Sequence, residues 1–389
     1  MKIAMIVRHF WLRKLTAIPR VVFEISNELI ENRVEVAIFT DKNPDYPDEI
    51  TLNNGLKIFF FQNVNEVFSN KTKFDIYHFY GSLLGSLFFV SKIRGEDVIL
   101  SIYTNKASLK DFLSISLKDF LIDRRILFTV NPIISSIIPK FVLKRNLKRS
   151  KKIIVNSKRF FDFYSNIIEN KNKVSRLLHG VDFEKFSNID RAKIFKLKRK
   201  LGFSLDDKII LYLGHNYLVR GIDDLINSME KVYKKCKKAK LLLVLNEMPG
   251  SNSKYIKKLV SKKLPKESAK IIFKYVKNVE LYYHISNVVV FPYRLSLEIP
   301  EYPLALLEAL SCGKAVIATK IGAIPEILVN NYNGILVRPK CKNDLENAIL
   351  KLLRNNKLSL KIGKNGRNSM KKFDWKIVSK KMLNYYEGI

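Results

Sequence analysis

Two short apolar runs, residues 288–291 and 315–318, flank a helix-forming stretch that begins after Pro303 and ends before Gly313. Proline suits a first helical position, and glycine commonly ends a helix. The order strand, loop, helix, strand is the unit of a parallel sheet. In such a unit the helix start lies beyond the carboxyl end of the first strand, where its free N–H groups and dipole favour a phosphate. The sequence therefore predicts a parallel sheet with an anion-binding helix start at Pro303 and Leu304.

One carboxylate, Glu308, lies inside this otherwise apolar helix. It follows Pro303 by about 8 Å along the helix, within reach of the ribose of a nucleotide whose phosphates lie at the helix start. A carboxylate can accept two hydrogen bonds, and a ribose diol offers two donors. The residues alone are equally compatible with a Glu308 that points to solvent or pairs with one of the many lysines.

Strand and helix patterns alternate along the whole chain of 389 residues. A chain of this length is too long for one core and favours two domains. We place the first domain at 1–195 and the second at 196–374, and we expect the final helix, 375–389, to pack back on the first. Alternating strands and helices predict an α/β fold with parallel sheets in each domain.

The helix and its surroundings resemble the C-terminal motif of the retaining family 4 glycosyltransferases, two-domain enzymes of the GT-B fold that use nucleotide-sugar donors. The similar positions are Glu308-Ala309-Leu310-Ser311-Cys312-Gly313, Gly322-Ala323-Ile324-Pro325-Glu326-Ile327 and Asn333-Gly334. The resemblance implies two Rossmann-like domains with parallel sheets that face a central cleft, and it implies that Glu308 holds the nucleotide ribose. The first glutamate of the family motif falls on Pro300 here. Its flanking carboxylates are the candidates instead, Glu301 for catalysis and Glu298 for substrate binding.

A second similar stretch, residues 214–221, follows an apolar strand at 209–213. In the family, an arginine and a lysine of this loop hold the donor diphosphate. Arg220 keeps the charge of the lysine, whereas His215 replaces the arginine and carries its charge only below about pH 6.5. The resemblance implies catalytic roles for Arg220 and His215 and a substrate-binding role for Gly214. From the residues alone, Arg220 could also be an ordinary surface side chain.

The N-terminal half differs from the family at two places. Family members usually carry a glycine pair in the first loop, where this chain has Thr16 and Ala17. They commonly carry a histidine after the strand that here covers 98–102, where this chain has Tyr103. We expect these three residues to contact substrate. Together with His215, the differences leave open an unusual acceptor or an inactive relative.

The cysteines and histidines predict neither a metal site nor a cofactor. The three cysteines are far apart and the five histidines show no paired spacing, which fits a reducing cytoplasm better than a disulfide framework. The apolar run 1–7 is too short for a secretory signal. The runs 79–91 and 126–139 fall short of the ~20 residues that a membrane-spanning helix needs.

The formal net charge of +34 is concentrated in one part of the chain. Residues 101–200 hold 24 basic and 8 acidic residues, and the run 140–152 holds seven cations and no acid. A short apolar run followed by a basic amphipathic helix predicts contact with an anionic membrane surface through 126–152. A solvated lysine face is the alternative. No nucleic-acid partner is expected, because no known nucleic-acid-binding motif accompanies the charge.

The sequence thus predicts a cytoplasmic glycosyltransferase that is peripheral to the inner face of the cell membrane. It would move a sugar from a nucleoside-diphosphate sugar to a lipid-linked glycan or another cell-envelope glycoconjugate, with retention of configuration and without a metal. A soluble sucrose- or glycogen-type transferase is the alternative enzyme. An inactive glycan-binding relative and a basic nucleic-acid-binding protein are the alternatives from other classes.

Overall fold

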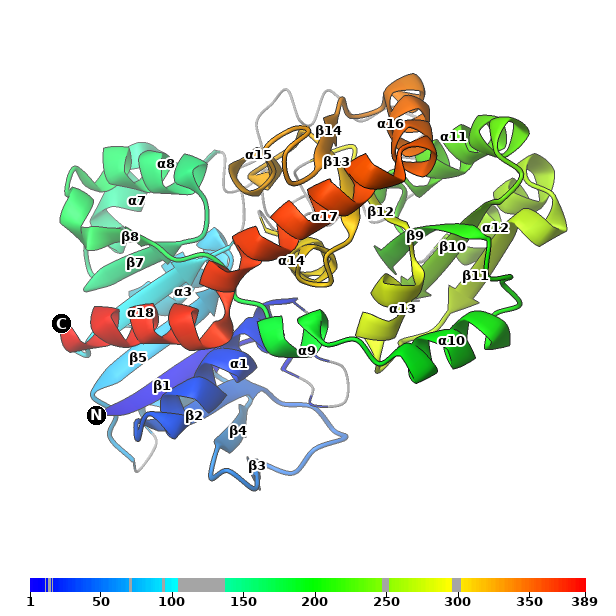
Figure 1. The fold of residues 1–389 in the computed structure, drawn as a ribbon. Coiled ribbons are helices and arrows are strands. Elements are labelled where there is room, and N and C mark those ends of the chain that lie inside the picture. The colour runs from blue at the N-terminus through cyan, green and yellow to red at the C-terminus, as the bar shows by residue number, and fades with distance from the viewer. Residues whose placement is uncertain are drawn as a thin grey trace. The chain divides into compact units, whose positions relative to one another are not determined.

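The computed structural model describes residues 1–10, 12, 15, 17–69, 72–92, 95–103, 137–246, 252–295 and 302–389. These residues form two compact units (Figure 1). Unit 1 contains the described residues up to Gly180 together with Phe373–Ile389, and unit 2 contains Val181–Lys372. Among the described residues, the chain passes into unit 2 after Gly180 and returns to unit 1 at Phe373. The boundary expected at residue 195 falls within helix α10, Arg191–Lys200.

Unit 1 is built on an eight-stranded sheet in the order β3-β4-β2-β1-β5-β6-β7-β8. The strands are β1 Lys2–Val7, β2 Glu35–Asp41, β3 Glu49–Thr51, β4 Lys57–Phe61, β5 Ile76–Gly81, β6 Val98–Ile102, β7 Lys152–Val155 and β8 Val174–Arg176. All neighbours are parallel except β3 and β4. Ile3 of β1 lies opposite Val36 on one side and Ile76 on the other. The central strands are apolar on both sides because helices cover both faces of the sheet.

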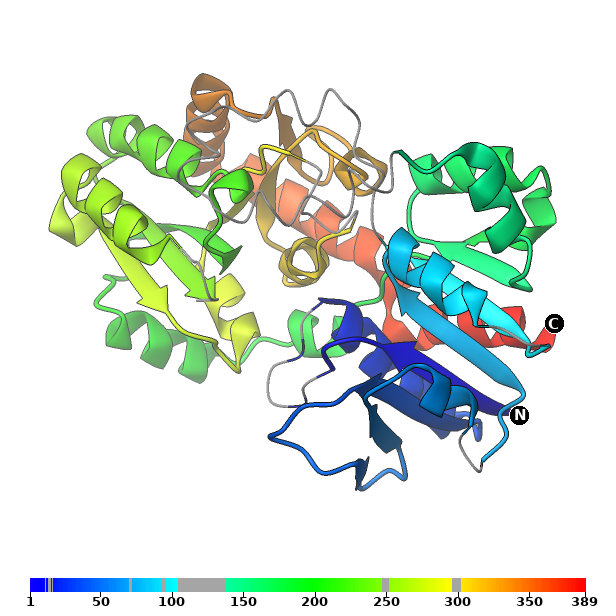
Figure 2. The ribbon, with the colours of Figure 1, turned by 180° about the vertical axis from the view of Figure 1, so that it is seen from behind.

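The described helices of unit 1 are α1 Ala17–Glu31, α2 Asn65–Phe68, α3 Leu83–Ser91, α7 Lys140–Leu147, α8 Lys158–Ile168 and α18 Trp375–Glu387. Helices α1 and α18 pack side by side on one face of the sheet (Figure 1), and α3 lies on the other (Figure 2). The apolar stripe of α1, with Val22, Ile25 and Leu29, is buried. A helix with such a stripe must bury it against another element, and here the sheet receives it.

Buried polar contacts hold α18 on the sheet of unit 1. His78 of β5 is fully buried, with Nδ1 2.6 Å from the Tyr386 hydroxyl and Nε2 2.8 Å from Ser101 Oγ. Burial holds the pKa of His78 well below its usual value, so the ring is neutral and has one donor and one acceptor nitrogen. Trp375, at the start of α18, packs so closely on Gly180 that an added Cβ would lie 2.2 Å from the indole ring.

We expect Tyr386→Phe to lower the free energy of unfolding by about 1–3 kcal/mol, because His78 would keep a buried ring nitrogen without its partner. Urea unfolding of the purified chain measures this loss. Tyr385→Phe is the matched control, since the Tyr385 hydroxyl donates to the carbonyl of Arg176 at 3.3 Å near the surface. Equal stability of the two variants would contradict the role of the His78 contact.

The sheet of unit 2 is fully parallel, with six strands in the order β11-β10-β9-β12-β13-β14. The strands are β9 Lys208–His215, β10 Ala239–Asn246, β11 Ala269–Phe273, β12 Val288–Phe291, β13 Ala315–Thr319 and β14 Ile335–Val337. The other described helices are α9 Phe183–Ser187, α11 Ile222–Lys235, α12 Ser253–Lys263, α13 Val279–Ile285, α14 Leu304–Ser311, α15 Ile324–Ile327, α16 Lys342–Arg354 and α17 Asn356–Met370. The predicted α/β fold with mainly parallel sheets is confirmed in both units.

The sequence analysis predicted one basic helix for the run 140–152. This prediction is wrong. Helix α7 ends at Leu147, a turn follows, and Lys152 begins β7. The β-branched residues Ile153, Ile154 and Val155 explain the change, because they are buried where β7 pairs with β6 and β8. Residues 126–136 of the expected membrane segment lie outside the described residues. Among the described residues, no helix has the length and apolar character to cross a membrane.

Candidate functional site

The predicted donor residues of unit 2 gather at one place in the sheet topology. From β9 the chain proceeds through β10 to β11 on one side, and from β12 through β13 to β14 on the other. In open parallel sheets, ligands bind beyond the carboxyl ends of the strands where the order reverses in this way. That point lies between β9 and β12. The loop 214–221 leaves β9 there, and the segment that leads to α14 leaves β12 there.

The loop after β9 holds its residues by aromatic contacts. Gly214 has φ +155°, within the region that favours glycine. The Tyr212 hydroxyl donates a 2.7 Å hydrogen bond to the carbonyl of His215, whose ring stacks on Tyr217 with centroids 5.5 Å apart. Arg220 ends the 3₁₀ turn Leu218–Arg220, and its guanidinium lies 5.1 Å from the centre of the Tyr293 ring. Arg220 is therefore held by an aromatic face rather than extended into solvent as an ordinary surface side chain.

The loops after β9 and β12 touch each other through backbone. Gly221 has φ +70°, and a Cβ there would lie 1.8 Å from the carbonyl oxygen of Pro292, so only glycine fits. The N–H of Arg294 donates to the carbonyl of Val219 at 3.0 Å. Tyr217, Val219 and Leu295 form a small buried cluster over this junction. The two loops are therefore one packed structure.

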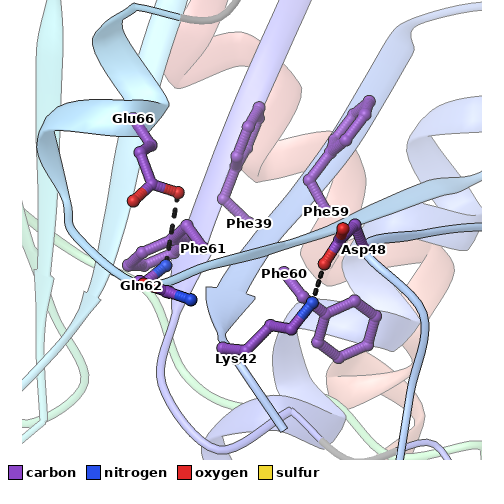
Figure 3. A pocket seen from close by; sticks show the side chains of 8 residues that line it. All are labelled: Phe39, Lys42, Asp48, Phe59, Phe60, Phe61, Gln62 and Glu66. Atoms are coloured by element: carbon purple, nitrogen blue, oxygen red, sulfur yellow. Dashed lines mark hydrogen bonds and ion pairs between the residues drawn. The ribbon is translucent and has the colours of Figure 1, made fainter. Parts of the chain in front are cut away.

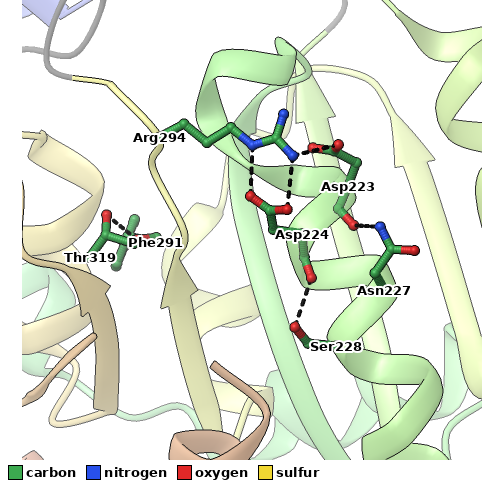
Figure 4. A network of polar contacts seen from close by, with 7 residues as sticks. All are labelled: Asp223, Asp224, Asn227, Ser228, Phe291, Arg294 and Thr319. Carbon is green, nitrogen blue, oxygen red and sulfur yellow. Dashed lines mark hydrogen bonds and ion pairs between the residues drawn. The ribbon is translucent and has the colours of Figure 1, made fainter. Parts of the chain in front are cut away.

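Arg294 adds an ionic connection between the same loops (Figure 4). Its Nε lies 2.6 Å from Asp224 Oδ2, and its terminal nitrogen lies 2.8 Å from Asp224 Oδ1 and 2.7 Å from Asp223 Oδ2. The exposed fraction of the side chain is only 12% for Arg294, 14% for Asp223 and 7% for Asp224. Burial raises the pKa of Asp223.

The Arg294 network was missed in the sequence analysis. Its only signal is the Asp223-Asp224 pair, which follows Arg220-Gly221 after one residue, and nothing local connects that pair to position 294. Two carboxylates in the first turn of α11 suit the positive end of the helix dipole. The guanidinium of Arg294 compensates one of these two negative charges.

We expect Arg294→Met to lower the free energy of unfolding by about 3–5 kcal/mol, the usual cost of leaving a buried charge without its partner. The triple variant Arg294→Met/Asp223→Asn/Asp224→Asn should recover a large part of that loss, because it also removes the two stranded charges. Urea unfolding of the single and triple variants measures both effects. A triple variant no more stable than Arg294→Met would contradict the electrostatic explanation.

Helix α14 is the first described helix after β12, so its start follows the same edge of the sheet. Leu304 is the first helical residue, and Pro303 is the N-cap rather than the first helical position that the sequence predicted. The reason is its extended backbone, with ψ 121°. Its carbonyl accepts the first helical bonds, from the N–H groups of Leu306 and Leu307. Helical geometry leaves the earlier N–H groups without a partner inside the helix, and the first turn holds no acid, so this end suits an anion.

Glu308 is buried, with 5% exposure, and its Oε2 accepts a 2.9 Å hydrogen bond from the hydroxyl of Tyr283. Tyr283 belongs to α13 and is itself fully buried. Burial and the nearby carboxylate raise the pKa of Tyr283 well above its usual value, so the phenol stays a donor. The interpretation of Glu308 as a solvent-exposed side chain is therefore wrong. Tyr283 was missed in the sequence analysis because nothing in its own segment distinguishes it from a core tyrosine.

The position of α13 depends on two buried bases. Lys314 Nζ donates to the carbonyls of His284 and Ser286, at 2.8 and 3.1 Å, and burial lowers the pKa of Lys314 to about 8. His284 Nε2 lies 3.1 Å from the carbonyl oxygen of Phe186. Burial, and then the charge of Lys314, lower the pKa of His284 to about 4. These contacts fix the helix that carries Tyr283.

We expect acid to destabilise unit 2 through His284. The pKa of His284 is lower in the folded chain than the usual value near 6.5, so the unfolded chain binds more protons between pH 6.5 and 4. Stability is therefore lost as pH falls through this window. His284→Gln should flatten that part of the curve of unfolding free energy against pH. Urea unfolding at a series of pH values measures both curves. Equal slopes for the parent and the variant between pH 6.5 and 4 would contradict this expectation.

The candidates of unit 1 are described only in part. Tyr103 follows β6 and is 9% exposed, between the rings of Tyr80 and His179 at 6.2 and 5.1 Å. Burial raises the pKa of its phenol. Ala17 is the first residue of α1. Thr16 of this unit lies outside the described residues, and so do Glu298 and Glu301, the two candidates of the segment between β12 and α14.

A separate cavity of about 360 Å³ lies in unit 1, at the carboxyl ends of β2 and β4 (Figure 3). Its lining combines phenylalanines with charged and amide side chains. They are Phe39, Lys42, Asp48, Phe59, Phe60, Phe61, Gln62 and Glu66. None of the residues predicted for the site lines this cavity. Among the described residues, no group of three or more His, Cys, Asp or Glu side chains is arranged to hold a metal ion.

Comparison with known sequences finds a family that matches unit 2. Residues 193–369, slightly less than half of the chain, match the sequence model of the family described as Glycosyl transferases group 1. The matched segment includes the loop after β9, helix α14 and Glu308. The match supports the resemblance to group 1 glycosyltransferases that the sequence analysis described.

A relative described as an uncharacterized glycosyltransferase of Methanocaldococcus jannaschii is 26% identical over 259 residues, which cover 64% of this chain and 62% of the relative. The match thus spans less than two thirds of the relative's length. A sucrose-phosphate synthase of Thermosynechococcus elongatus superposes with a TM-score of 0.81 at 20% identity, over 100% of this chain and 98% of that chain. The Anabaena protein HepE in complex with UDP gives a TM-score of 0.78 at 13% identity, over the whole of both chains. The predicted GT-B fold with two Rossmann-like domains is confirmed.

Proposed function

We propose that this glycosyltransferase takes a sugar from a nucleoside-diphosphate sugar held at the β9–β12 edge of unit 2. The observation that carries the proposal is Glu308, a buried carboxylate oriented by Tyr283 on the helix whose start opens at that edge. A buried carboxylate is costly unless its hydrogen bonds are satisfied. A ribose diol supplies two further donors, which gives the buried charge a function.

In this proposal Arg220, His215 and the start of α14 stabilise the leaving diphosphate. The reaction needs that stabilisation most in the transition state, where the charge on the diphosphate grows. Arg220 supplies a fixed charge, the first N–H groups of α14 supply donors, and Gly214 allows close approach of the donor. These groups can neutralise the leaving group without a divalent metal. Glu301 and Glu298 are proposed to contact the transferred sugar, and retention of configuration follows the family.

We propose that unit 1 binds the acceptor, with Thr16, Ala17 and Tyr103 among its contacts. The proposed acceptor is a lipid-linked glycan or another cell-envelope glycoconjugate, encountered at the inner face of the membrane. The support is the charge of unit 1, because a cationic protein is attracted to anionic lipid. A carrier lipid would present its glycan at such a surface.

The test separates the ribose contact from the phosphate contact. We expect Glu308→Ala to cost on the order of 2–4 kcal/mol of affinity for uridine monophosphate and diphosphate alike, since both carry the ribose and charge-assisted hydrogen bonds contribute ~1.5–3 kcal/mol each. Arg220→Ala should spare the monophosphate, weaken the diphosphate, and lower donor turnover more than donor binding. Calorimetric titration and donor hydrolysis rates measure these effects.

Two controls exclude a general loss of structure. Glu308→Gln keeps the volume of the side chain, and Glu346→Ala removes another buried carboxylate of unit 2, one paired with Lys235 on α11. Glu346→Ala should bind uridine nucleotides like the parent. If Glu308→Ala and Glu308→Gln also bind like the parent, the ribose role is wrong. Nucleotide binding without any donor turnover would instead favour the inactive relative.

A further inference from the structure

Unit 1 exposes three large apolar side chains beside its most basic segment. Phe88 of α3, Ile137 and Phe141 of α7 are 60%, 74% and 72% exposed. Helices α3 and α7 pack against each other. Their opposite sides, with Phe89, Leu143 and Leu147, lie in the core of unit 1. Phe88 and Phe141 therefore lie on helices held firmly by the fold, and Ile137 shortly precedes α7. Folding alone gives no reason to leave them in water.

Helix α7 carries apolar and cationic residues on the same outward side. Phe141, Arg145 and Lys148 follow one another at spacings of four and three residues, so they share one face. Leu143 and Leu147 are fully buried on the other face. Arg145 and Lys148 are exposed, and Lys92 Nζ lies 5.7 Å from the centre of the Phe88 ring. Phe88 and Phe141 thus each have a cation near them.

The surrounding segment is strongly cationic. Residues 137–176 contain twelve Lys and Arg residues and two acids, Asp162 and Glu169. Glu169 forms an ion pair with Lys144. Lys144 is therefore largely compensated, and the remaining cations dominate the field around α7. A partner that is anionic over a broad area would fit this charge.

We propose that the α3–α7 surface, defined as Phe88, Ile137, Phe141, Arg145 and Lys148, docks unit 1 on an anionic lipid surface. Large apolar side chains gain by entering the boundary between headgroups and acyl chains, while Lys and Arg remain at the headgroups. A nucleic-acid backbone would use the cations but would leave Ile137 in water. This inference deepens the proposed function, because it names the surface that brings unit 1 to a lipid-linked acceptor.

The first experiment tests the charge. The whole chain is sedimented with vesicles of phosphatidylcholine alone or with 30% phosphatidylglycerol, at about 0.1 M salt. Arg145→Gln/Lys148→Gln should lower partitioning to the anionic vesicles on the order of thirtyfold, from the contribution of two cations near the surface. Lys196→Gln/Lys200→Gln removes two exposed cations from α10 of unit 2 and should partition like the parent.

The second experiment tests the apolar anchors. Phe88→Ser/Phe141→Ser should lower partitioning to the anionic vesicles by roughly tenfold or more, because two apolar side chains no longer enter the lipid boundary. Leu205→Ser/Leu360→Ser is the matched control, because these leucines of unit 2 are 70% and 65% exposed. It should bind vesicles like the parent. All four replaced side chains are at the surface, so unchanged melting temperatures are expected.

Three outcomes would overturn the proposal. They are equal binding of the parent to both kinds of vesicle, binding to neither, and variants of the α3–α7 surface that bind like the parent. Steep salt-dependent binding to duplex DNA, with no vesicle binding, would assign the charge to nucleic acid. Titration with UDP keeps the two proposals apart. A parent chain that binds UDP but no vesicles refutes only the membrane surface, and a parent chain that binds anionic vesicles but not UDP refutes only the donor site.

Discussion

The contact of Arg294 with Asp223 and Asp224 is the interaction on which the proposed donor site depends most. It joins the first turn of α11 to the segment after β12, in nearly complete burial. Parallel strands bring their carboxyl ends to one edge but do not by themselves connect the loops that leave it. Arg294 supplies that connection, and Gly221 allows the backbones to meet. Arg220 consequently has a defined position against Tyr293 rather than a range of surface conformers.

A second group of polar contacts orients Glu308. The carboxylate lies within the apolar helix α14, where an unsatisfied charge would cost several kcal/mol. Tyr283 satisfies part of its hydrogen-bonding capacity, and Lys314 holds the end of the helix that carries Tyr283. Two elements separate in the sequence thus hold one side chain in place. Such preorganisation is what a ligand site requires, because the cost of ordering is met during folding and not during binding.

The two units use charge differently. In unit 1 the buried polar groups, such as His78 with Tyr386, attach the C-terminal helix to the sheet, whereas the cations remain outside on α7 and its neighbours. In unit 2 the key charges are buried and paired at the sheet edge. Long-range attraction acts through exposed cations and is screened by salt. Buried pairs are screened much less, so they can fix the geometry of a site.

The sequence by itself determined the local elements and the order in which they follow. The β-branched run 288–291 and the proline and glycine around α14 are readable, because strand and helix preferences act over a few neighbouring residues. Glu308 was found for the same reason, as a carboxylate in an apolar helix, whereas Arg220 was found through the resemblance of its loop to the family. Only the tertiary structure decided what these side chains touch. Arg294 lies 70 residues from Asp224 along the chain, and Phe88 is far from Phe141. Contacts over such separations are set by how sheets and helices pack, and no local pattern encodes which surface side chains the packing leaves exposed.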